Sequence, residues 1–217
     1  MNGLLDLDGN DSDMVFGEIS ERKQLERAMR DAGRLPPGQS ATLKWPVLHV
    51  GDVPPFDPQT WDFRVTGWVE KPLRLNWEEF THLPMREVTA DMHCVTRWSR
   101  FDVRWKGVAF SEVARLAVVK PEAKYVMVHA EYDFRSNVPL DDLMRPTTLF
   151  ALEHDGKPLP ADHGYPVRLV VPHLYAWKSV KWVRGIEFMT DDAPGFWEEN
   201  GYNMYGDPFR EQRFSDR

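Results

Sequence analysis

The stretch Met92-His93-Cys94-Val95-Thr96-Arg97-Trp98-Ser99 contains the only cysteine of the chain. The run from Val88 to Cys94 predicts a strand that ends at this cysteine. A lone cysteine is most often a small buried hydrophobe, but here polar and basic residues follow it. Positive charge near a thiol favours the thiolate, which is the form that binds metals. Cys94 is therefore a candidate metal ligand, and Arg97 beside it a candidate catalytic residue.

The chain offers few other ligands for a metal. It has no second cysteine, and its histidines show neither an HxxxH nor an HExxH spacing, so a zinc site made of protein ligands alone is not expected. Soft thiolate ligands suit thiophilic metals. If Cys94 binds a metal, a cofactor must supply most of the remaining ligands.

The size and charge of the chain limit its possible functions. A chain of 217 residues that is 42% hydrophobic can bury one full core without disulfides. We expect a tail and a helix over residues 1–40, followed by one domain over residues 41–217. The net charge of −7 argues against a nucleic-acid partner. A local basic pocket for one anionic ligand remains compatible with that charge.

The N-terminal sequence predicts a cytoplasmic protein without a membrane partner. The first twenty residues are acidic and contain no basic leader, no apolar run and no twin-arginine pair. No stretch approaches the ~20 apolar residues of a membrane helix. A reducing compartment would also keep a lone thiol available for chemistry.

Short strands with few short helices predict an α+β fold built on mixed β-sheets. Residues 1–19 are predicted to be a mobile tail, and Ser20 to cap a helix that runs to about Arg30. The tail from Pro194 to Arg217 is predicted to wrap the surface. The other helices expected are a short one capped by Asn76, one capped by Ser111 over residues 112–117, and a turn or two over residues 139–144. The strands expected span residues 61–65, 88–94, 125–130, 149–153, 167–171 and 180–188, with a hairpin turn at Asp155-Gly156.

Four blocks of sequence, in order, carry a resemblance to a known family. They are Pro54-Pro55-Phe56-Asp57-Pro58-Gln59-Thr60-Trp61 running into Val65-Thr66-Gly67; Cys94 with Trp98-Ser99 and Trp105-Lys106-Gly107-Val108; His163-Gly164-Tyr165-Pro166-Val167-Arg168-Leu169-Val170-Val171-Pro172; and Ser179-Val180-Lys181-Trp182-Val183 with Gly195-Phe196-Trp197-Glu198. Together they resemble the molybdopterin domain of the sulfite oxidase family, to which the catalytic subunit of the bacterial periplasmic methionine-sulfoxide reductase also belongs. The resemblance covers about residues 45 to 200.

This resemblance implies a molybdopterin-dependent oxidoreductase. A single pyranopterin dithiolene would hold molybdenum, with the Cys94 thiolate as the protein ligand. By position, His163 and Arg168 would contact the pterin and its phosphate. Arg offers a planar fork for phosphate, whereas a lone Arg in a strand is as often a surface ion pair. The remaining cofactor-binding candidates are His49, Asp133, Ser179, Val180 and Lys181.

The sequence departs from true sulfite oxidases at two places where that substrate needs charge. Leu48 stands where those enzymes place a substrate-binding arginine, and the segment of the active-site tyrosine has Phe134 in or near its position. A C-terminal domain that supplies a further arginine is not part of this sequence. Arg97, Arg100 and Arg135 are the residues that could compensate. We therefore expect reduction of a small neutral S- or N-oxide rather than oxidation of sulfite.

Two other functions are compatible with parts of the sequence. A non-catalytic carrier of the molybdopterin would need the phosphate and pterin contacts, but it would not need a metal-binding thiolate. A binding module without metal fits the basic residues Arg168 and Lys181 but not Cys94. The retention of Cys94 favours the enzyme. The substrate, the electron donor or acceptor and the oligomeric state stay open.

Overall fold

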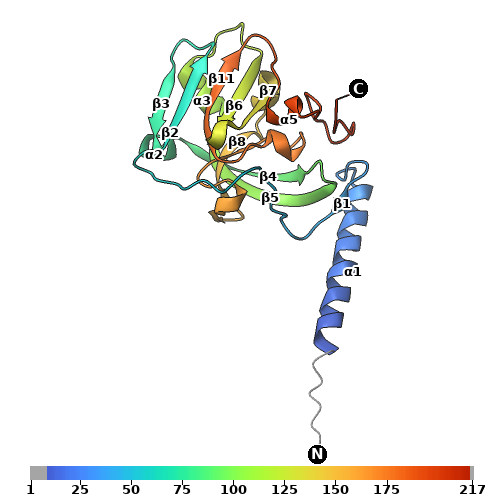
Figure 1. Ribbon diagram of the computed structural model, residues 1–217. Helices are drawn as coiled ribbons and strands as arrows, with labels where there is room; N and C mark the ends of the chain where they lie inside the picture. Colours follow the sequence, from blue (N-terminus) through green and yellow to red (C-terminus); the bar gives the residue numbers. More distant parts are fainter. Residues whose placement is uncertain (1–8, 216–217) are drawn as a thin grey trace, which may run out of the picture.

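The computed structural model describes residues 9–215 and has two mixed β-sheets with few, short helices, as the sequence predicted (Figure 1). The first sheet has the order β1-β5-β8-β10, with β4 on β5 and β9 on β8; the second has the order β3-β2-β11-β6-β7. The strands of the first sheet are β1 (Ser40–Ala41), β4 (Met85–His93), β5 (Trp98–Ala109), β8 (Leu149–His154), β9 (Lys157–Pro158) and β10 (Arg168–Val170). Those of the second are β2 (Asp62–Gly67), β3 (Leu73–Asn76), β6 (Tyr125–Ala130), β7 (Arg135–Pro139) and β11 (Val183–Met189).

Both faces of the first sheet are buried, as the alternation along β8 shows. Phe150 and Leu152 belong to the main core, which the first sheet shares with the second. Leu149 and Ala151 point to the opposite face and join a second cluster of apolar side chains. Phe63 of the second sheet meets Phe150 edge to face, with ring centroids 5.0 Å apart. The loops that carry the candidate site are therefore attached to a sheet with packed side chains on both faces, which holds them in place.

The helices are short except for the first, which extends away from the body of the molecule (Figure 1). They are α1 (Gly9–Asp31), α2 (Trp77–Thr81), α3 (Phe110–Ala117), α4 (Leu140–Leu143) and α5 (Phe196–Glu199), with single 3₁₀ turns η1 (Glu131–Asp133), η2 (Ala161–His163) and η3 (Ala176–Lys178). In the part of the chain that the structure covers, no helix is both long and apolar enough to cross a membrane.

The first helix corrects the prediction of a mobile tail up to residue 19. Helix α1 begins at Gly9, so Ser20 lies in its interior, where its hydroxyl accepts a hydrogen bond from Gln24 at 3.4 Å. Gly17 has the lowest helix propensity of the residues inside this part of α1, and a long helix tolerates its cost of about 1 kcal/mol. Residues 1–8 of the expected tail lie outside the described residues. The division of the chain at residue 40 stays a prediction.

The two other predicted helix caps, Asn76 and Ser111, differ in outcome. Asn76 caps α2 as predicted, in a capping box in which its side chain accepts from the Glu79 amide at 2.9 Å. The prediction for Ser111 is wrong, because α3 starts at Phe110, two residues earlier than predicted, and follows directly from the end of β5. The Ser111 hydroxyl instead accepts a hydrogen bond from Arg86 at 3.2 Å.

Most predicted strands are confirmed, with shifted ends. Tyr125–Ala130 has the predicted bounds, and Asp155 and Gly156 both have positive φ in the tight turn between β8 and β9. The last strand starts at Val183 rather than Val180, so residues 180–182 form a loop. The longest of the described strands, β5, was not among the predicted ones, although Phe101 to Lys106 alternate between apolar and charged residues as a half-buried strand does.

Candidate active site

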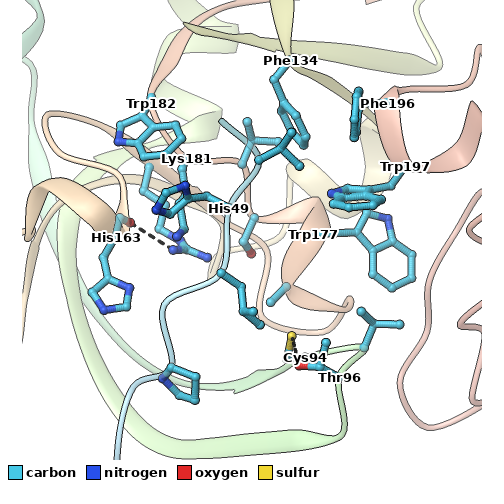
Figure 2. Close-up of a pocket in the computed structure, with 18 of the residues that line it drawn as sticks. His49, Cys94, Thr96, Phe134, His163, Trp177, Lys181, Trp182, Phe196 and Trp197 are labelled. Atoms are coloured by element: carbon cyan, nitrogen blue, oxygen red, sulfur yellow. Dashed lines mark hydrogen bonds between the residues drawn. The ribbon is translucent and has the colours of Figure 1, made fainter. Parts of the chain in front are cut away.

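A cavity of about 350 Å³ opens beside the end of β4. Five stretches of chain contribute to its wall: residues 45–51, 92–98, 131–134, 163–182 and 196–202. Seven of the nine predicted site residues lie on this wall. They are His49, Cys94, His163, Arg168, Ser179, Val180 and Lys181. Figure 2 shows His163 and Lys181 on one side, Phe196 and Trp197 on the other, and Cys94 between them.

Cys94 is held at the tip of a tight turn between β4 and β5. Its amide donates to the Trp98 carbonyl at 2.9 Å, and its carbonyl accepts from the Gln39 side chain at 2.9 Å. The Thr96 hydroxyl donates to the Cys94 sulfur at 3.1 Å, as Figure 2 shows. The residue is buried, yet it lines the cavity. The backbone thus fixes the sulfur in one direction, as a metal ligand requires.

Arg168 is a buried cation without a carboxylate partner in the part of the chain that the structure describes. Its side chain donates to the His163 carbonyl at 3.0 Å, while its Nε has no hydrogen-bond partner. Burial lowers its pKa to about 10, and the opposing charge of Cys94 only partly offsets this effect. An unpaired buried charge is costly. An anion bound in the cavity would supply the missing countercharge.

Lys181 adds a second cation next to Arg168. Its ammonium donates to the Asp162 carbonyl at 2.6 Å. Burial and then the charge of Arg168 lower the pKa of Lys181 to about 7. Gly164 makes this proximity possible, because its φ is +116° and a Cβ there would lie 3.1 Å from Cβ of Arg168 and 3.2 Å from Cβ of Lys181.

The loop after η3 offers backbone donors beside these two cations. The Ser179 hydroxyl accepts from the Val171 amide at 2.9 Å, and the Val180 carbonyl accepts from the Leu169 amide at 2.8 Å. These bonds fix the loop against β10. Within the described chain, the amides of Val180 and Lys181 donate to no backbone carbonyl. They are available to a ligand.

His163 and His49 present imidazole rings to the cavity. Burial and then the charge of Lys181 lower the pKa of His163 to about 4, so its ring is neutral at pH 7. The ring stacks on Trp45 at a centroid distance of 3.7 Å, and its Nδ1 has no hydrogen-bond partner. His49 is exposed, with Nδ1 2.9 Å from the Gly51 carbonyl oxygen. Neutral imidazoles can both donate and accept, as the edge of a pterin requires.

The structure does not bring Arg97 and Asp133 to the cavity wall. Arg97 has a φ of +73° at the turn after Cys94 and points towards Gly38, where its guanidinium lies 3.3 Å from the place of a glycine Cβ. Asp133 also has a positive φ, 57°, and is exposed, whereas its neighbours Tyr132 and Phe134 line the cavity. The left-handed turn reverses which side chains face inward, and the sequence alone could not show this.

Several residues of the wall were not predicted to take part in a site. Thr96, Trp45 and Trp177 are the main ones, together with Tyr202 from the C-terminal segment. The many aromatic residues after residue 194 could have indicated a part of the site, but from the sequence this segment was predicted only to wrap the surface of the protein. Leu48, Trp98 and Phe134 also line the cavity, so part of its wall is apolar.

Comparison with known proteins assigns the chain to a class. The profile of the family described as oxidoreductase molybdopterin binding domain matches residues 50–197. The chain therefore belongs to this family, is an oxidoreductase and uses a molybdopterin cofactor. The resemblance inferred from the four blocks of sequence is confirmed.

Individual relatives agree with this assignment. The chain is 47% identical over 203 residues to the uncharacterized oxidoreductase YuiH of Bacillus subtilis, covering 93% of this chain and 99% of that protein. It is 30% identical over 168 residues to the protein-methionine-sulfoxide reductase catalytic subunit MsrP of Campylobacter jejuni, covering 70% of this chain and 56% of that protein. It thus spans just over half of that second relative.

A solved structure shares the fold. The sulfane dehydrogenase SoxCD from Paracoccus pantotrophus matches with a TM-score of 0.60 at 24% identity, over 69% of this chain and 42% of that one. At this identity the match concerns the fold alone. It agrees with the α+β architecture described above.

The residues of the cavity fit a molybdopterin. Arg168 lacks a countercharge and Lys181 lies beside it, so a phosphate would satisfy both. Among the described residues, no group of three or more His, Cys, Asp or Glu side chains is placed to hold a metal. A metal at Cys94 would therefore need ligands from the cofactor, and a dithiolene provides them.

Proposed function

We propose that this protein reduces a small neutral S- or N-oxide, with a single pyranopterin cofactor whose molybdenum is bound by Cys94. The observation that carries the choice of substrate is the position of the arginines that could compensate for Leu48. Arg100 is paired with Asp155 at 2.9 Å, and Arg135 with Glu199 at 2.6 Å. Neither lines the cavity, and neither does Arg97. Among the described residues, the cavity wall has no Lys or Arg besides Arg168 and Lys181, so the part of the cavity beyond Cys94 offers no cation of the kind that a sulfite anion needs.

Each residue of the site then has a task that follows from its chemistry. Arg168 and Lys181 bind the phosphate, and the amides of Val180 and Lys181 with the neutral His163 orient the pterin. Cys94 fixes the metal, with its sulfur oriented by the Thr96 hydroxyl. The bound cofactor supplies the two-electron chemistry of oxygen-atom transfer. Buried Trp177 excludes water from the side next to Cys94.

The presence of Cys94 on the wall also favours this function over a carrier of the cofactor. A carrier would need only the phosphate and pterin contacts at Arg168, Lys181 and His163. In this chain the backbone turn, Gln39 and Thr96 all serve to orient the thiol into the same cavity. A carrier would not need a thiol held in this way, whereas an enzyme whose metal takes part in chemistry would.

Protein purified from a host that makes molybdopterin tests the substrate. Reduction of a sulfoxide takes up two electrons and two protons and releases the thioether and water. We expect kcat/KM for a neutral sulfoxide, with reduced viologen as donor, to exceed that for sulfite oxidation with ferricyanide by about thirtyfold or more. Efficient sulfite oxidation without reduction of any sulfoxide or N-oxide, in the same preparation, would show the proposal to be wrong.

The pKa of Lys181 predicts how cofactor retention depends on pH. Below its pKa of about 7, the side chain of Lys181 is a charged ammonium and attracts the phosphate. Above that pKa, Lys181 is neutral in the empty site and must take up a proton when the cofactor binds. A bound phosphate would raise the pKa of Lys181. Between pH 7 and that higher pKa, we expect the affinity of the protein for the cofactor to fall by up to about tenfold per pH unit. Pterin content after dialysis at pH 6.5, 8 and 9 measures this. The Lys181→Met variant should show no such decline, and an equal decline in both proteins would contradict the assignment.

A further inference from the structure

An unbroken series of aromatic contacts forms the side of the cavity that faces away from the cations. Trp177 meets Tyr202 edge to face at 5.1 Å, and Tyr202 stacks on Trp197 at 4.8 Å. Trp197 contacts Phe196 at 5.1 Å, which contacts Phe134 at 5.4 Å. All five line the cavity, and Figure 2 shows four of them on the side opposite His163 and Lys181.

Cys94 lies between the cationic and the aromatic sides. It lines the same cavity as Arg168 and Lys181 on one side and Trp177 and Trp197 on the other. A ligand that reaches Cys94 from the aromatic side therefore meets no cationic side chain among the described wall residues. The negative faces of the rings disfavour an anion there.

A buried ion pair fixes this aromatic side in place. Lys178 and Glu198 form a salt bridge of 2.6 Å with both side chains fully buried. The pair follows Trp177 and Trp197 in the sequence, and Glu198 also accepts from the Trp177 indole at 2.8 Å. Burying two charges is costly, so a structure that only needed packing would be served as well by apolar side chains. The pair locks both tryptophans into a single arrangement.

The C-terminal segment closes the same wall from behind. The Lys178 ammonium donates to the Met204 carbonyl at 2.8 Å, which ties this segment to η3. Gly206, with a φ of +85°, lies against Trp177 so closely that a Cβ would be 2.7 Å from the indole ring. Tyr175 also stacks on the Trp177 ring at 5.3 Å, so the indole is held in place where it lines the cavity.

We propose that this aromatic wall is the substrate subsite and that it takes the apolar, preferably aromatic, substituent of a neutral sulfoxide. The inference rests on the proposed function and adds the class of substrate. The S–O bond would lie near Cys94, and the substituent would pack against the cavity side of Trp197 and Phe196, because Tyr202 already lies between Trp177 and Trp197. The S–O bond breaks, the sulfur is reduced by two electrons from an external one-electron donor such as reduced viologen, and two protons from solvent leave with the oxygen as water.

Three sulfoxides of graded character test the subsite: methyl phenyl sulfoxide, dimethyl sulfoxide and methyl 4-carboxyphenyl sulfoxide. We expect a KM about tenfold to a hundredfold lower for the phenyl compound than for the dimethyl compound, since burial of a ring of this size favours binding by that factor. The carboxylate should raise KM above that of the phenyl compound by at least about tenfold.

A matched pair of variants tests whether the aromatic wall causes the preference for the phenyl compound. Trp197→Leu should bring the KM of methyl phenyl sulfoxide to within about threefold of that of dimethyl sulfoxide. Trp68→Leu makes the same substitution at an exposed tryptophan away from this cavity, and it should leave the preference unchanged. Quenching of tryptophan fluorescence by methyl phenyl sulfone, which resembles the substrate but lacks a reducible S–O bond under these conditions, measures binding without turnover. It should weaken about tenfold or more in Trp197→Leu.

The outcomes separate this inference from the proposed function. If wild-type protein reduces the phenyl and dimethyl compounds with equal KM, the proposed function stands and the aromatic subsite is wrong. Unchanged sulfone binding in Trp197→Leu would also overturn the subsite. If fully loaded protein reduces an N-oxide but none of the three sulfoxides, the proposed function stands and the sulfoxide subsite is wrong. If it reduces neither the sulfoxides nor an N-oxide, the proposed function fails, and the assignment of the wall to a substrate fails with it.

Discussion

Replacement of Cys94 by serine is expected to abolish redox turnover, with a loss of at least about a hundredfold in kcat. Removal of groups that only orient a metal ligand already costs about tenfold to a hundredfold, and here the single protein ligand would be lost. A serine hydroxyl has nearly the same size as the thiol but is a harder ligand. The measurement is dye-linked sulfoxide reduction, normalised to the molybdenum and pterin content of each preparation.

The fold should survive this change, which makes the result interpretable. The turn that holds Cys94 depends on its backbone bonds to Trp98 and Gln39, and neither bond uses the sulfur. Far-ultraviolet circular dichroism and the thermal midpoint should therefore match those of wild-type protein. Full activity per bound molybdenum in Cys94→Ser would contradict the role of this residue as the metal ligand.

Replacement of Arg168 by alanine is expected to reduce cofactor retention by roughly tenfold to a hundredfold. A charge-assisted contact of the kind proposed with the phosphate contributes about 1.5–3 kcal/mol. Because Arg168 is buried and has no carboxylate partner among the described residues, its removal breaks no ion pair of the protein itself. Pterin content after extended dialysis, followed by fluorescence of the released cofactor, gives the retention.

Two further variants separate binding from bracing of the fold. Arg168→Lys keeps the charge but loses the planar fork, so its retention should be intermediate. Arg104→Ala removes an exposed arginine of β5, whose only ion pair in the described structure is a long one of 4.0 Å to Asp155, and retention should not change. Unchanged pterin content in Arg168→Ala would show that Arg168 only braces the loop at His163.

The class of fold could be predicted from local signals, whereas most of the cofactor end of the site was predicted by position from the resemblance to a known family. Alternation and turn residues identified β6, the β8–β9 turn and the Asn76 cap. Gly164 of the third block and Lys181 of the fourth suit their positions by residue type. A glycine is needed where φ is positive and two side chains lie close, and a lysine is suited to bind a phosphate. Seven of nine site candidates consequently meet in one cavity.

The aromatic side could not be predicted in the same way, because it is assembled by contacts between segments distant in sequence. Phe134 and Trp177 come from separate loops, and only the fold brings them together with Tyr202. The inward and outward directions around Tyr132 depend on two consecutive residues with positive φ, which no pattern of residue types specifies. The partner of Lys178 likewise lies twenty residues further along the chain, so its burial was invisible in the sequence.

X-ray absorption at the molybdenum edge tests the central claim most directly, that Cys94 is the protein ligand of a single-pyranopterin molybdenum centre. The loaded wild-type protein should show three sulfur neighbours, two from the dithiolene and one from Cys94. The Cys94→Ser variant should retain the two dithiolene sulfurs and replace the third by a lighter atom. An equal number of sulfur neighbours in both proteins would contradict the claim.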